Sequence, residues 1–253
     1  MSIRGVNNSY SLNDSYAKLS AGKRINSAKD DAAGLGIAKK EEALSRGYDA
    51  GTNNLKSADN FLNVRDGALG SIGDSLQRLR ELAVGAANTA VYGDDDVEAM
   101  QDEADQLLQG INDVVEQTTY NGKRVLENGS YNVNGGNSVT NFDTKYAGLE
   151  ALGLKGFSLA DNDAVSKIDS AINKINSDRS AGGASSNALH YQINQNAGQS
   201  FNAVSAQSRI EDLDYGKAMS DKKKNEVLNA YNIQMQKKRE EQEANKVNRL
   251  LGL

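Results

Sequence analysis

Clusters of carboxylates are the first residues in this sequence that could do chemistry. Asp30 and Asp31 lie side by side in RINSAKDDAAGLGIA at residues 24–38, and a second run of acids follows Gly93 at residues 94–96. Such clusters could hold Ca²⁺ or Mg²⁺, but a calcium loop needs acids at alternate positions, a central glycine and a glutamate at its twelfth position. The stretch DDDVEAMQDEAD lacks this spacing. We therefore interpret both clusters as groups that cap helix starts and shape the backbone.

A single histidine and the absence of cysteine limit catalysis. A zinc-protease helix needs two histidines four residues apart, and His190 is the only histidine. A serine–histidine–aspartate triad would also depend on His190, whose surroundings, NALHYQINQ, are helical in pattern and contain no nucleophile elbow. Without cysteine there are no thiolate metal sites or cysteine nucleophiles. We predict a protein that is not an enzyme, with no metal site and no cofactor, and assign His190 a surface or packing role.

Charge and hydropathy argue against two classes of partner. The formal net charge is −5 and the charges are well mixed, so the chain has no global attraction to nucleic acid or acidic lipid. The basic residues of segment 217–253 alternate with acids in blocks suited to i,i+4 pairs, without interleaved aromatic residues. The chain shows neither the apolar core of a signal peptide nor the roughly 20 apolar residues of a spanning helix. We expect no nucleic-acid partner, no membrane partner and no cleaved signal peptide.

The elements that position these residues are predicted to be long helices. Only 38% of the residues are hydrophobic and 6% aromatic, which favours thin layers of paired helices, and proline, which breaks helices, is absent. Between residues 57 and 87 apolar residues recur three and four apart, and only Arg65 interrupts them. This helix can begin as early as Leu35. The stripe consists of Leu62, Leu69, Ile72, Leu76, Leu79, Ala83 and Ala86.

The middle of the sequence predicts a second helix followed by a small β element. Apolar residues from Val97 to Thr118 keep strict three-four spacing, namely Val97, Met100, Ala104, Leu107, Ile111, Val114 and Thr118. The turn signal NGGN then predicts a hairpin over about residues 130–142, after a short strand near residues 123–126.

Two further helices complete the pattern. One starts near Ala164, is weakened at SAGGASSNAL and continues with Leu189, Ile193, Ala197, Phe201, Val204 and Ile210. The other spans about residues 217–250 and begins with Val227, Leu228, Tyr231 and Met235. Neither terminal segment can bury its stripe alone. We predict a mainly α fold, in which both chain ends form a long antiparallel helical rod or coiled coil, with a small β-hairpin region near mid-chain.

Four ordered motifs extend over both ends of the chain. They are LSAGKRINSAKDDAAGLGIA at residues 19–38, LQRLRELAVGAAN at 76–88, MQDEADQLLQGINDVVEQTTYNGKRVL at 100–126 and AQSRIEDLDYGKAM at 206–219. This set resembles the signatures of the bacterial flagellins, the subunits of the flagellar filament. Since only about 40 residues separate Leu126 from the third helix, the resemblance implies a short form without the family's variable outer domain.

The resemblance also implies a domain organisation and a destination. Residues 1–25 and 218–253 would form a discontinuous inner coiled-coil domain. Residues 26–217 would form a helical rod domain, with the β-hairpin at about 123–142 and spoke segments at 26–36 and 208–217. The subunit would leave by the flagellar type III route without a cleaved signal peptide and self-assemble outside the cell into the helical filament used for motility. An export chaperone and the filament cap and junction proteins are implied as partners.

Three groups of site residues follow from the resemblance. In the family a Toll-like receptor contacts the QRLRELA helix and part of the next helix, which here implies Arg78, Leu82 and Glu103. Candidates for the spoke and for assembly are Arg24, Asn26, Asp30, Asp31, Arg209, Glu211 and Asp212. We expect Lys23, Arg24 and Lys29 to pair with Glu211, Asp212 or Asp214, within or between subunits. Candidates for inner-domain packing are Val227, Leu228, Tyr231, Met235, Leu250 and Leu251.

Two departures from the family keep alternatives open. The segment before LSAG is shorter than is usual, and QMQKKREEQEANK is densely charged where the family's C-terminal helix is mostly uncharged. A minor or specialised flagellin is one alternative, and a hook–filament junction protein, which shares the terminal helices, is another. An enzymatic insert in a flagellin frame would have no room.

Overall fold

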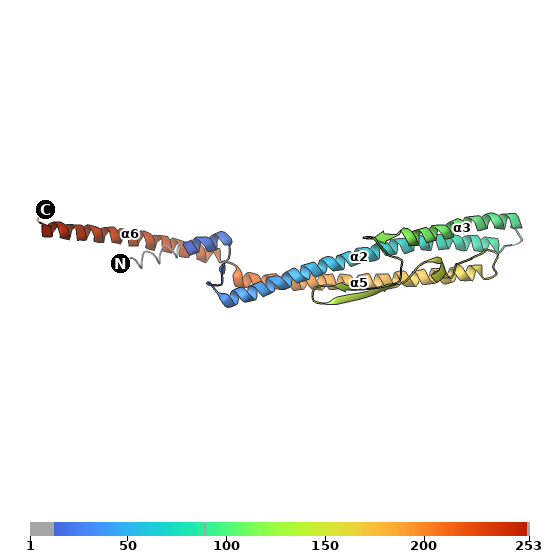
Figure 1. Ribbon diagram of the computed structural model, residues 1–253, viewed down its shortest axis with the longest axis horizontal. Helices are drawn as coiled ribbons and strands as arrows, with labels where there is room; N and C mark the ends of the chain where they lie inside the picture. Colours follow the sequence, from blue (N-terminus) through green and yellow to red (C-terminus); the bar gives the residue numbers. More distant parts are fainter. Residues whose placement is uncertain (1–12, 89, 252–253) are drawn as a thin grey trace. The chain divides into compact units, whose positions relative to one another are not determined.

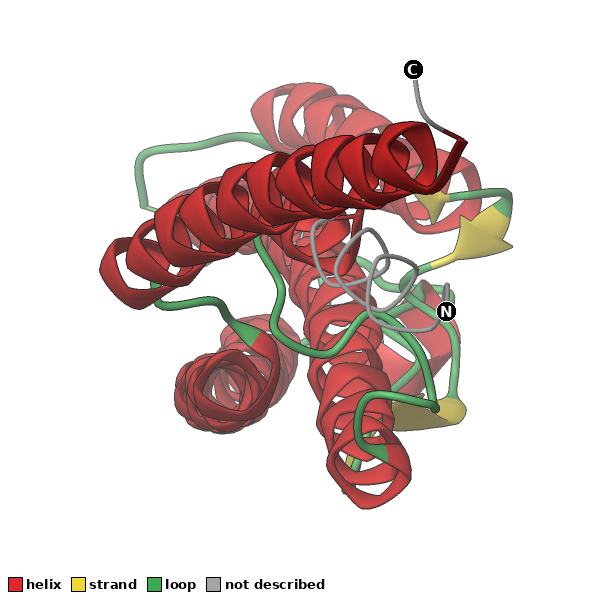
Figure 2. Ribbon diagram, turned by 90° about the vertical axis from the view of Figure 1, so that its left-hand side faces the viewer, coloured by secondary structure: helices red, strands yellow, loops and turns green. Residues whose placement is uncertain are grey.

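Long helices and two short antiparallel strand pairs make up the fold. The computed structural model describes residues 13–88 and 90–251, apart from the side chains of Asn248, Leu250 and Leu251. The order of the elements is α2 (Ala32–Ala86), α3 (Asp94–Gln117), β1 (Thr119–Tyr120), β2 (Lys123–Arg124), β3 (Gly129–Asn134), β4 (Val139–Thr144), α4 (Leu149–Leu152), α5 (Ala164–Glu211) and α6 (Tyr215–Leu251). A short helical segment precedes them at residues 13–21. The predicted mainly α fold with a mid-chain hairpin is confirmed (Figure 1, Figure 2).

The chain divides into two compact units. One comprises Met1–Ser45 with Phe201–Leu253, and the other comprises Arg46–Ser200. We call them the terminal unit and the central unit. The predicted division into inner and rod domains, with boundaries at residues 25 and 218, concerns the organisation within a filament and stays a prediction. Within the described residues, no helix combines the length and the apolar character needed to cross a membrane.

In the central unit α3, α2 and α5 lie against one another. Two ion pairs join α2 to α5: Arg80 pairs with Asp169, and Asp66, nearer the start of α2, pairs with Arg179, further along α5. The two helices therefore run antiparallel. Figure 1 shows α3 folded back along α2. The predicted α2 stripe is buried throughout, and α3 adds Ala104, Leu108, Ile111 and Val115 to the same core. These α3 positions are spaced by four, three and four residues, as one buried face of a helix requires.

Arg65 does not break the α2 stripe, contrary to the sequence interpretation. Its side chain is only 2% exposed. The guanidinium donates from Nε to the carbonyl oxygen of Val125 and from Nη2 to that of Lys145, each at 3.0 Å, and it pairs with the buried Asp178 of α5. A charge is tolerated in this core because its hydrogen-bonding groups meet a carboxylate and backbone carbonyls.

The buried face of α5 also differs from the prediction. It includes Ile168, Ile175, Leu189, Asn196 and Ala203, spaced by seven residues or a multiple of seven. Phe201 and Val204, predicted to continue the stripe, are exposed, with 71% of Phe201 accessible. The prediction failed because a polar residue, Asn196, occupies the buried register, while the large apolar residues flank it. The helix runs unbroken through SAGGASSNAL.

Asn196 explains how the hairpin is held. Strands β3 and β4 pair antiparallel from Gly129↔Thr144 to Asn134↔Val139, close to the predicted range. The buried Asn196 amide donates to the carbonyl oxygen of Gly135 at the hairpin tip at 2.8 Å. On α2, a side chain at Gly51 would come within 2.2 Å of the Gly135 backbone, so the tip can approach the helix only because residue 51 is glycine.

Candidate assembly and recognition surfaces

Two junction motifs that are far apart in the sequence meet in the terminal unit. We call residues 22–31 together with residues 208–215 the joint. The Arg24 amide donates to the Glu211 carbonyl at 2.6 Å, and the Leu213 amide donates to the Gly22 carbonyl at 3.1 Å. Lys23 and Asp212 face each other as an isolated antiparallel bridge. Backbone bonds therefore set the register between two segments that are far apart in the sequence.

A partly buried ion pair supports this register. Lys23 Nζ lies 2.7 Å from Glu211 Oε2, and Glu211 is only 2% exposed. The Lys23 hydrogen bond, aided by one from Gln207, holds the pKa of the Glu211 carboxyl below its ordinary value. Arg24 instead donates from Nη2 to the Ile210 carbonyl at 2.8 Å. Of the expected pairs, the structure forms Lys23–Glu211 within the chain.

Asp30 binds the backbone of the turn that precedes it. Its Oδ2 accepts from the amide of Asn26 at 3.1 Å, and from the amide and hydroxyl of Ser27 at 3.0 and 3.1 Å. These bonds, the one from the Asn26 amide above all, lower the pKa of the Asp30 carboxyl. Lys18 adds a weaker contact at 3.7 Å.

Asp31 caps the start of α2. Its Oδ1 accepts from the amide of Gly34 at 2.8 Å, so one of the unpaired amides in the first helical turn finds an acceptor. A side chain at Gly34 would collide with Asp31 Oδ2 at 2.4 Å. Both acids bind backbone, and the interpretation of this pair as a backbone-shaping element is confirmed. In the run at residues 94–96, Asp96 also binds backbone, because its Oδ2 accepts a hydrogen bond from the Gly93 amide at 3.0 Å.

The remaining joint candidates lie at its surface. Asp212 accepts a hydrogen bond from Ser208, and Asp214 Oδ1 caps α6 by accepting from the Lys217 amide at 3.0 Å. Arg209 and Lys29 are exposed. Sequence reasoning missed Tyr215, whose hydroxyl donates to the Leu19 carbonyl at 3.0 Å. An aromatic residue at the start of a helix gives no pattern from which such a long-range bond could be predicted.

The predicted packing stripe of α6 is open to solvent in the single chain. Val227, Leu228 and Tyr231 are exposed, by 69%, 44% and 58%, and Met235 is half-buried. Leu250 and Leu251 lie on the same helix, but their side chains fall outside the described residues. The helix has formed an apolar face that nothing in the described chain covers.

The predicted recognition residues divide between surface and core. Arg78 Nε donates to Glu103 Oε1 at 2.7 Å across the α2–α3 seam, and Nη1 donates to Glu81 Oε2 at 2.9 Å. The side chains of Arg78 and Glu103 are 49% and 44% exposed. The Arg78 hydrogen bond lowers the pKa of the Glu103 carboxyl. Leu82, in contrast, is 6% exposed and belongs to the core. Glu81 was not predicted.

His190 makes a hydrogen-bonding contact at the surface, with 60% of its side chain exposed. Its Nε2 lies 3.0 Å from Asp59 Oδ2, and Ser186 donates to the other oxygen of the same carboxylate at 2.5 Å. The carboxylate thus lies between the hydroxyl and the imidazole. A catalytic triad needs the reverse, with the imidazole between the two. This arrangement links α5 to α2 and does not activate Ser186.

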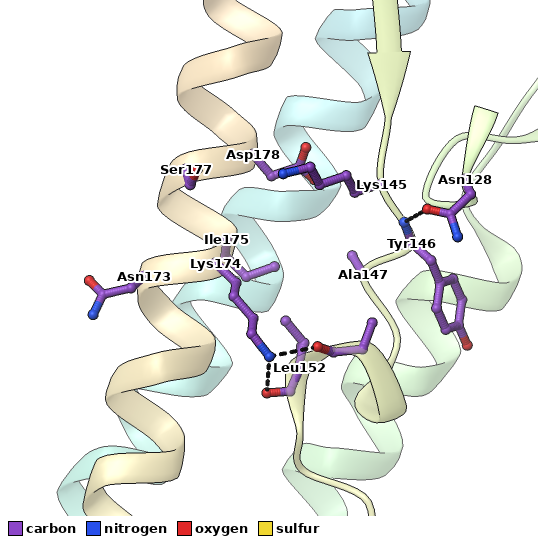
Figure 3. Close-up of a pocket in the computed structure, with 11 residues that line it drawn as sticks. Asn128, Lys145, Tyr146, Ala147, Leu152, Asn173, Lys174, Ile175, Ser177 and Asp178 are labelled. Carbon is purple, nitrogen blue, oxygen red and sulfur yellow. Dashed lines mark hydrogen bonds between the residues drawn. The ribbon is translucent and has the colours of Figure 1, made fainter. Parts of the chain in front are cut away.

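A hollow of about 580 Å³ lies between α5 and residues 145–152 of the central unit (Figure 3). Lys174 points across it and donates to the carbonyl oxygens of Ala151 and Leu152 at 2.8 and 3.3 Å. The Asn128 side chain accepts from the Tyr146 amide at 2.9 Å. Asp178 at its edge is paired with Arg65. Lys174 thus binds the backbone of the α4 segment, and Asp178 belongs to the buried ion pair of the core.

Comparison with known proteins identifies the family. The bacterial flagellin N-terminal helical region matches residues 1–130, and the bacterial flagellin C-terminal helical region matches residues 165–250. The chain is 32% identical to the flagellin of Bacillus subtilis, with 83% of each chain covered. It is also 32% identical to the flagellar filament 33 kDa core protein of Treponema phagedenis, over 88% of this chain and 86% of the relative.

A solved structure agrees with this result. The crystal structure of Bacillus cereus flagellin superimposes with a TM-score of 0.50 and 26% identity, covering 57% of this chain and 88% of that chain. The relatives are named as flagellins or filament core proteins, which favours a filament subunit over a hook–filament junction protein. The chain belongs to the bacterial flagellin family, in a short form, and is a structural subunit of the flagellar filament outside the cell.

Proposed function

We propose that this subunit polymerises through its terminal unit, with the joint and the apolar face of α6 buried between copies. The observation that carries the proposal is the exposure of Val227, Leu228 and Tyr231 on one stretch of α6. Exposed apolar side chains gathered on one helix are a typical mark of an interaction surface. In a filament the contacts are heterologous and do not close, so the same faces repeat from copy to copy.

Truncation tests this role of α6. A chain that ends at residue 216 retains the whole central unit, whose core lies between Leu55 and Leu189. We expect it to remain folded and soluble, with the helical circular dichroism of the central unit, and to form no filaments under the electron microscope. The full-length chain under the same conditions is the positive control. Filaments of normal length from the truncated chain would overturn the proposal.

Export and partner binding follow the family in this proposal. The subunit passes through the flagellar type III route without a cleaved signal peptide, and it meets an export chaperone and the cap and junction proteins of the filament. The sequence supports this because it contains no cysteine to form disulfides and no proline to kink its helices. Deletion of an export component should retain the intact chain inside the cell. Unchanged secretion in that strain would contradict the route.

A second role, recognition by a Toll-like receptor, is favoured by the exposed Arg78–Glu103 pair. A guanidinium held in place by two carboxylates presents a defined charge at the α2–α3 seam, and arginine is enriched among interface hot spots. Arg78→Ala should weaken a receptor reporter response roughly tenfold, the loss expected of a hot-spot side chain. Arg80→Ala is the matched control, since Arg80 is similarly exposed but pairs with Asp169 on α5. An equal response for both variants would exclude the site.

We also infer that the subunit has no catalytic role. The acids that could have formed a site, Asp30, Asp31 and Asp96, bind backbone amides, and Asp59 is shared by Ser186 and His190. The variant His190→Gln should assemble like the wild type. A chemical activity lost in that variant would contradict the inference.

A further inference from the structure

The β3–β4 hairpin has an apolar body and a polar tip. Residues 134–138, which form the tip, are Asn, Gly, Gly, Asn and Ser. In the body, Tyr131 and Phe142 pack against Phe61 of α2, with ring centroids 5.0 and 6.0 Å from that of Phe61. Apolar contacts can therefore hold the body on α2, whereas the tip depends on hydrogen bonds.

Two asparagine side chains clamp the tip from two helices. Asn54 of α2 donates from Nδ2 to the carbonyl oxygen of Asn134 at 3.1 Å, and Asn196 of α5 donates from Nδ2 to that of Gly135 at 2.8 Å. The two acceptors are consecutive carbonyls. Asn54 is exposed, so water competes for its bond, whereas Asn196 is only 1% exposed. Water cannot take the place of Asn196 while the tip stays docked.

The docked tip needs the Asn196 donor. Gly135 is buried, and its backbone lies so close to α2 that a side chain at Gly51 would come within 2.2 Å of it. A buried carbonyl that loses its donor is costly, so docking is favourable only while Asn196 donates to Gly135. The other end of the Asn196 amide is satisfied as well, because its Oδ1 accepts from Gln192 Nε2 at 3.2 Å.

Asn196 lies at a position where the α5 seam is otherwise apolar. Ile168, Ile175, Leu189 and Ala203 share its buried register, at steps of seven residues or a multiple of seven. A single buried polar residue in an apolar seam specifies one arrangement at a cost in stability. A large apolar side chain at residue 196 would bury more apolar surface but would offer no donor to the hairpin tip.

We propose that Asn196 determines the position of the hairpin tip, at the expense of apolar burial in the seam between α2 and α5. The inference concerns the single chain and does not rest on the proposed assembly. Without the Asn196 donor, the tip moves outward so that water reaches the Gly135 carbonyl, while the aromatic contacts keep the hairpin body in place. Asn196 is a positioning residue, and its replacement changes the structure of the tip more than the stability of the chain.

Distances between spin labels can test this proposal. The chain contains no cysteine, so labels attach only where cysteine is introduced. One labelled pair, Asn137→Cys with Ser71→Cys, reports on the tip. A second pair, Asn132→Cys with Ser71→Cys, reports on the hairpin body. All three positions are exposed, and Ser71 lies about 30 Å along α2 from Gly51, a span that pulsed electron paramagnetic resonance measures well.

Replacing Asn196 should release the tip alone. In the full-length, unpolymerised chain, both pairs should give one narrow distance. Asn196→Leu should lower the ratio of docked to undocked tips at least about tenfold, so that the tip pair shows a second or broadened distance while the body pair is unchanged. The midpoint of chemical denaturation should stay at or above that of the wild type, because leucine adds apolar burial. Asn196→Ala, which adds no bulk, should release the tip as well.

Asn194→Leu is the matched control. It makes the same exchange two residues away at an exposed position, and it should leave both distances unchanged. Asn54→Ala, at the exposed member of the clamp, should move the tip less than Asn196→Leu does. A larger effect of Asn54→Ala would assign the positioning role to Asn54 and overturn the proposal.

Three further outcomes would also overturn it. An unchanged tip distance in both Asn196 variants would mean that the tip docks without this donor. Release by leucine but not by alanine would mean that bulk displaces the tip. A lowered denaturation midpoint, with both labelled pairs broadened, would mean that Asn196 supports the whole central unit and does not position the tip.

Discussion

The central and terminal units bury their apolar residues to very different extents. The contiguous core of the described chain lies between Leu55 and Leu189, all of it within the central unit. The described residues of the terminal unit contribute Ile25, Ala38 and Ala203 as buried apolar side chains. Large apolar residues such as Phe201, Val227 and Tyr231 remain exposed there. The central unit thus has a contiguous core of its own, whereas the described part of the terminal unit has few buried apolar side chains.

Their ion pairs differ in the same way. The Arg65–Asp178 pair of the central unit is buried on both sides. The Lys23–Glu211 pair of the terminal unit has a buried carboxylate but a lysine that is 42% exposed. Buried charges are costly to leave unpaired, whereas exposed charges are easily solvated. Removing one partner should therefore cost more at the Arg65–Asp178 pair of the central unit than at the Lys23–Glu211 pair, whose lysine is partly solvated.

The largest effect should come from removing the buried charge of Arg65. Arg65→Met leaves Asp178 unpaired in the core and should lower the free energy of unfolding by about 3–5 kcal/mol, measured by chemical denaturation. Arg65→Met combined with Asp178→Leu should recover much of the loss, because no buried charge is left alone. If the single variant unfolds at the wild-type denaturant concentration, the pair does not stabilise the central unit as described.

The next largest difference compares one substitution in the two units. Leu76→Ala removes a fully buried side chain and should cost about 2–5 kcal/mol. Leu228→Ala alters a residue that is 44% exposed and should change the stability of the single chain by less than about 0.5 kcal/mol. In filament assembly the order of the two variants should change, because Leu228→Ala should raise the critical concentration for polymerisation. Equal destabilisation of the free chain by both changes would remove the contrast between the units.

The pH dependence of the joint provides a smaller effect. Lys23 lowers the pKa of Glu211 below its ordinary value of 4.5, so the folded joint prefers the ionised carboxyl. The stabilisation is present above about pH 4.5 and is lost as the pH falls through the lowered pKa. Hydrogen exchange at the Arg24 and Leu213 amides, corrected for intrinsic rates, should accelerate in that range. Glu211→Gln should abolish this dependence, at a cost of about 1 kcal/mol.

The smallest effect is expected for the exposed Arg78–Glu103 pair. A double-mutant cycle with Arg78→Ala and Glu103→Ala should give a coupling of about 0.2–1 kcal/mol, because both side chains are partly solvated. The same cycle at Arg65 and Asp178 should give several times more. A coupling energy of equal size at the two pairs would mean that burial does not strengthen the interaction between Arg65 and Asp178.

Much of the fold followed from local patterns in the sequence. The long α2 stripe, the start of α5 at Ala164 and the NGGN hairpin were predicted within a few residues, because periodic apolar spacing and turn residues act over short distances. The roles of Asp31 and Asp96 as caps were likewise predicted, since a cap lies next to the helix that it serves. The family resemblance also came from contiguous motifs.

Long-range partners could be seen only in the tertiary structure. The sequence marks Arg65 as an interruption, and only the approach of Val125, Lys145 and Asp178 makes it part of the core. It marks Phe201 as apolar, and only the buried register of Asn196 and Ala203 shows that Phe201 faces outward. The sequence by itself determined which segments become helices or turns, because those interactions are local. The tertiary structure decided which charges are buried and which apolar faces stay open, because burial depends on residues far apart in the chain.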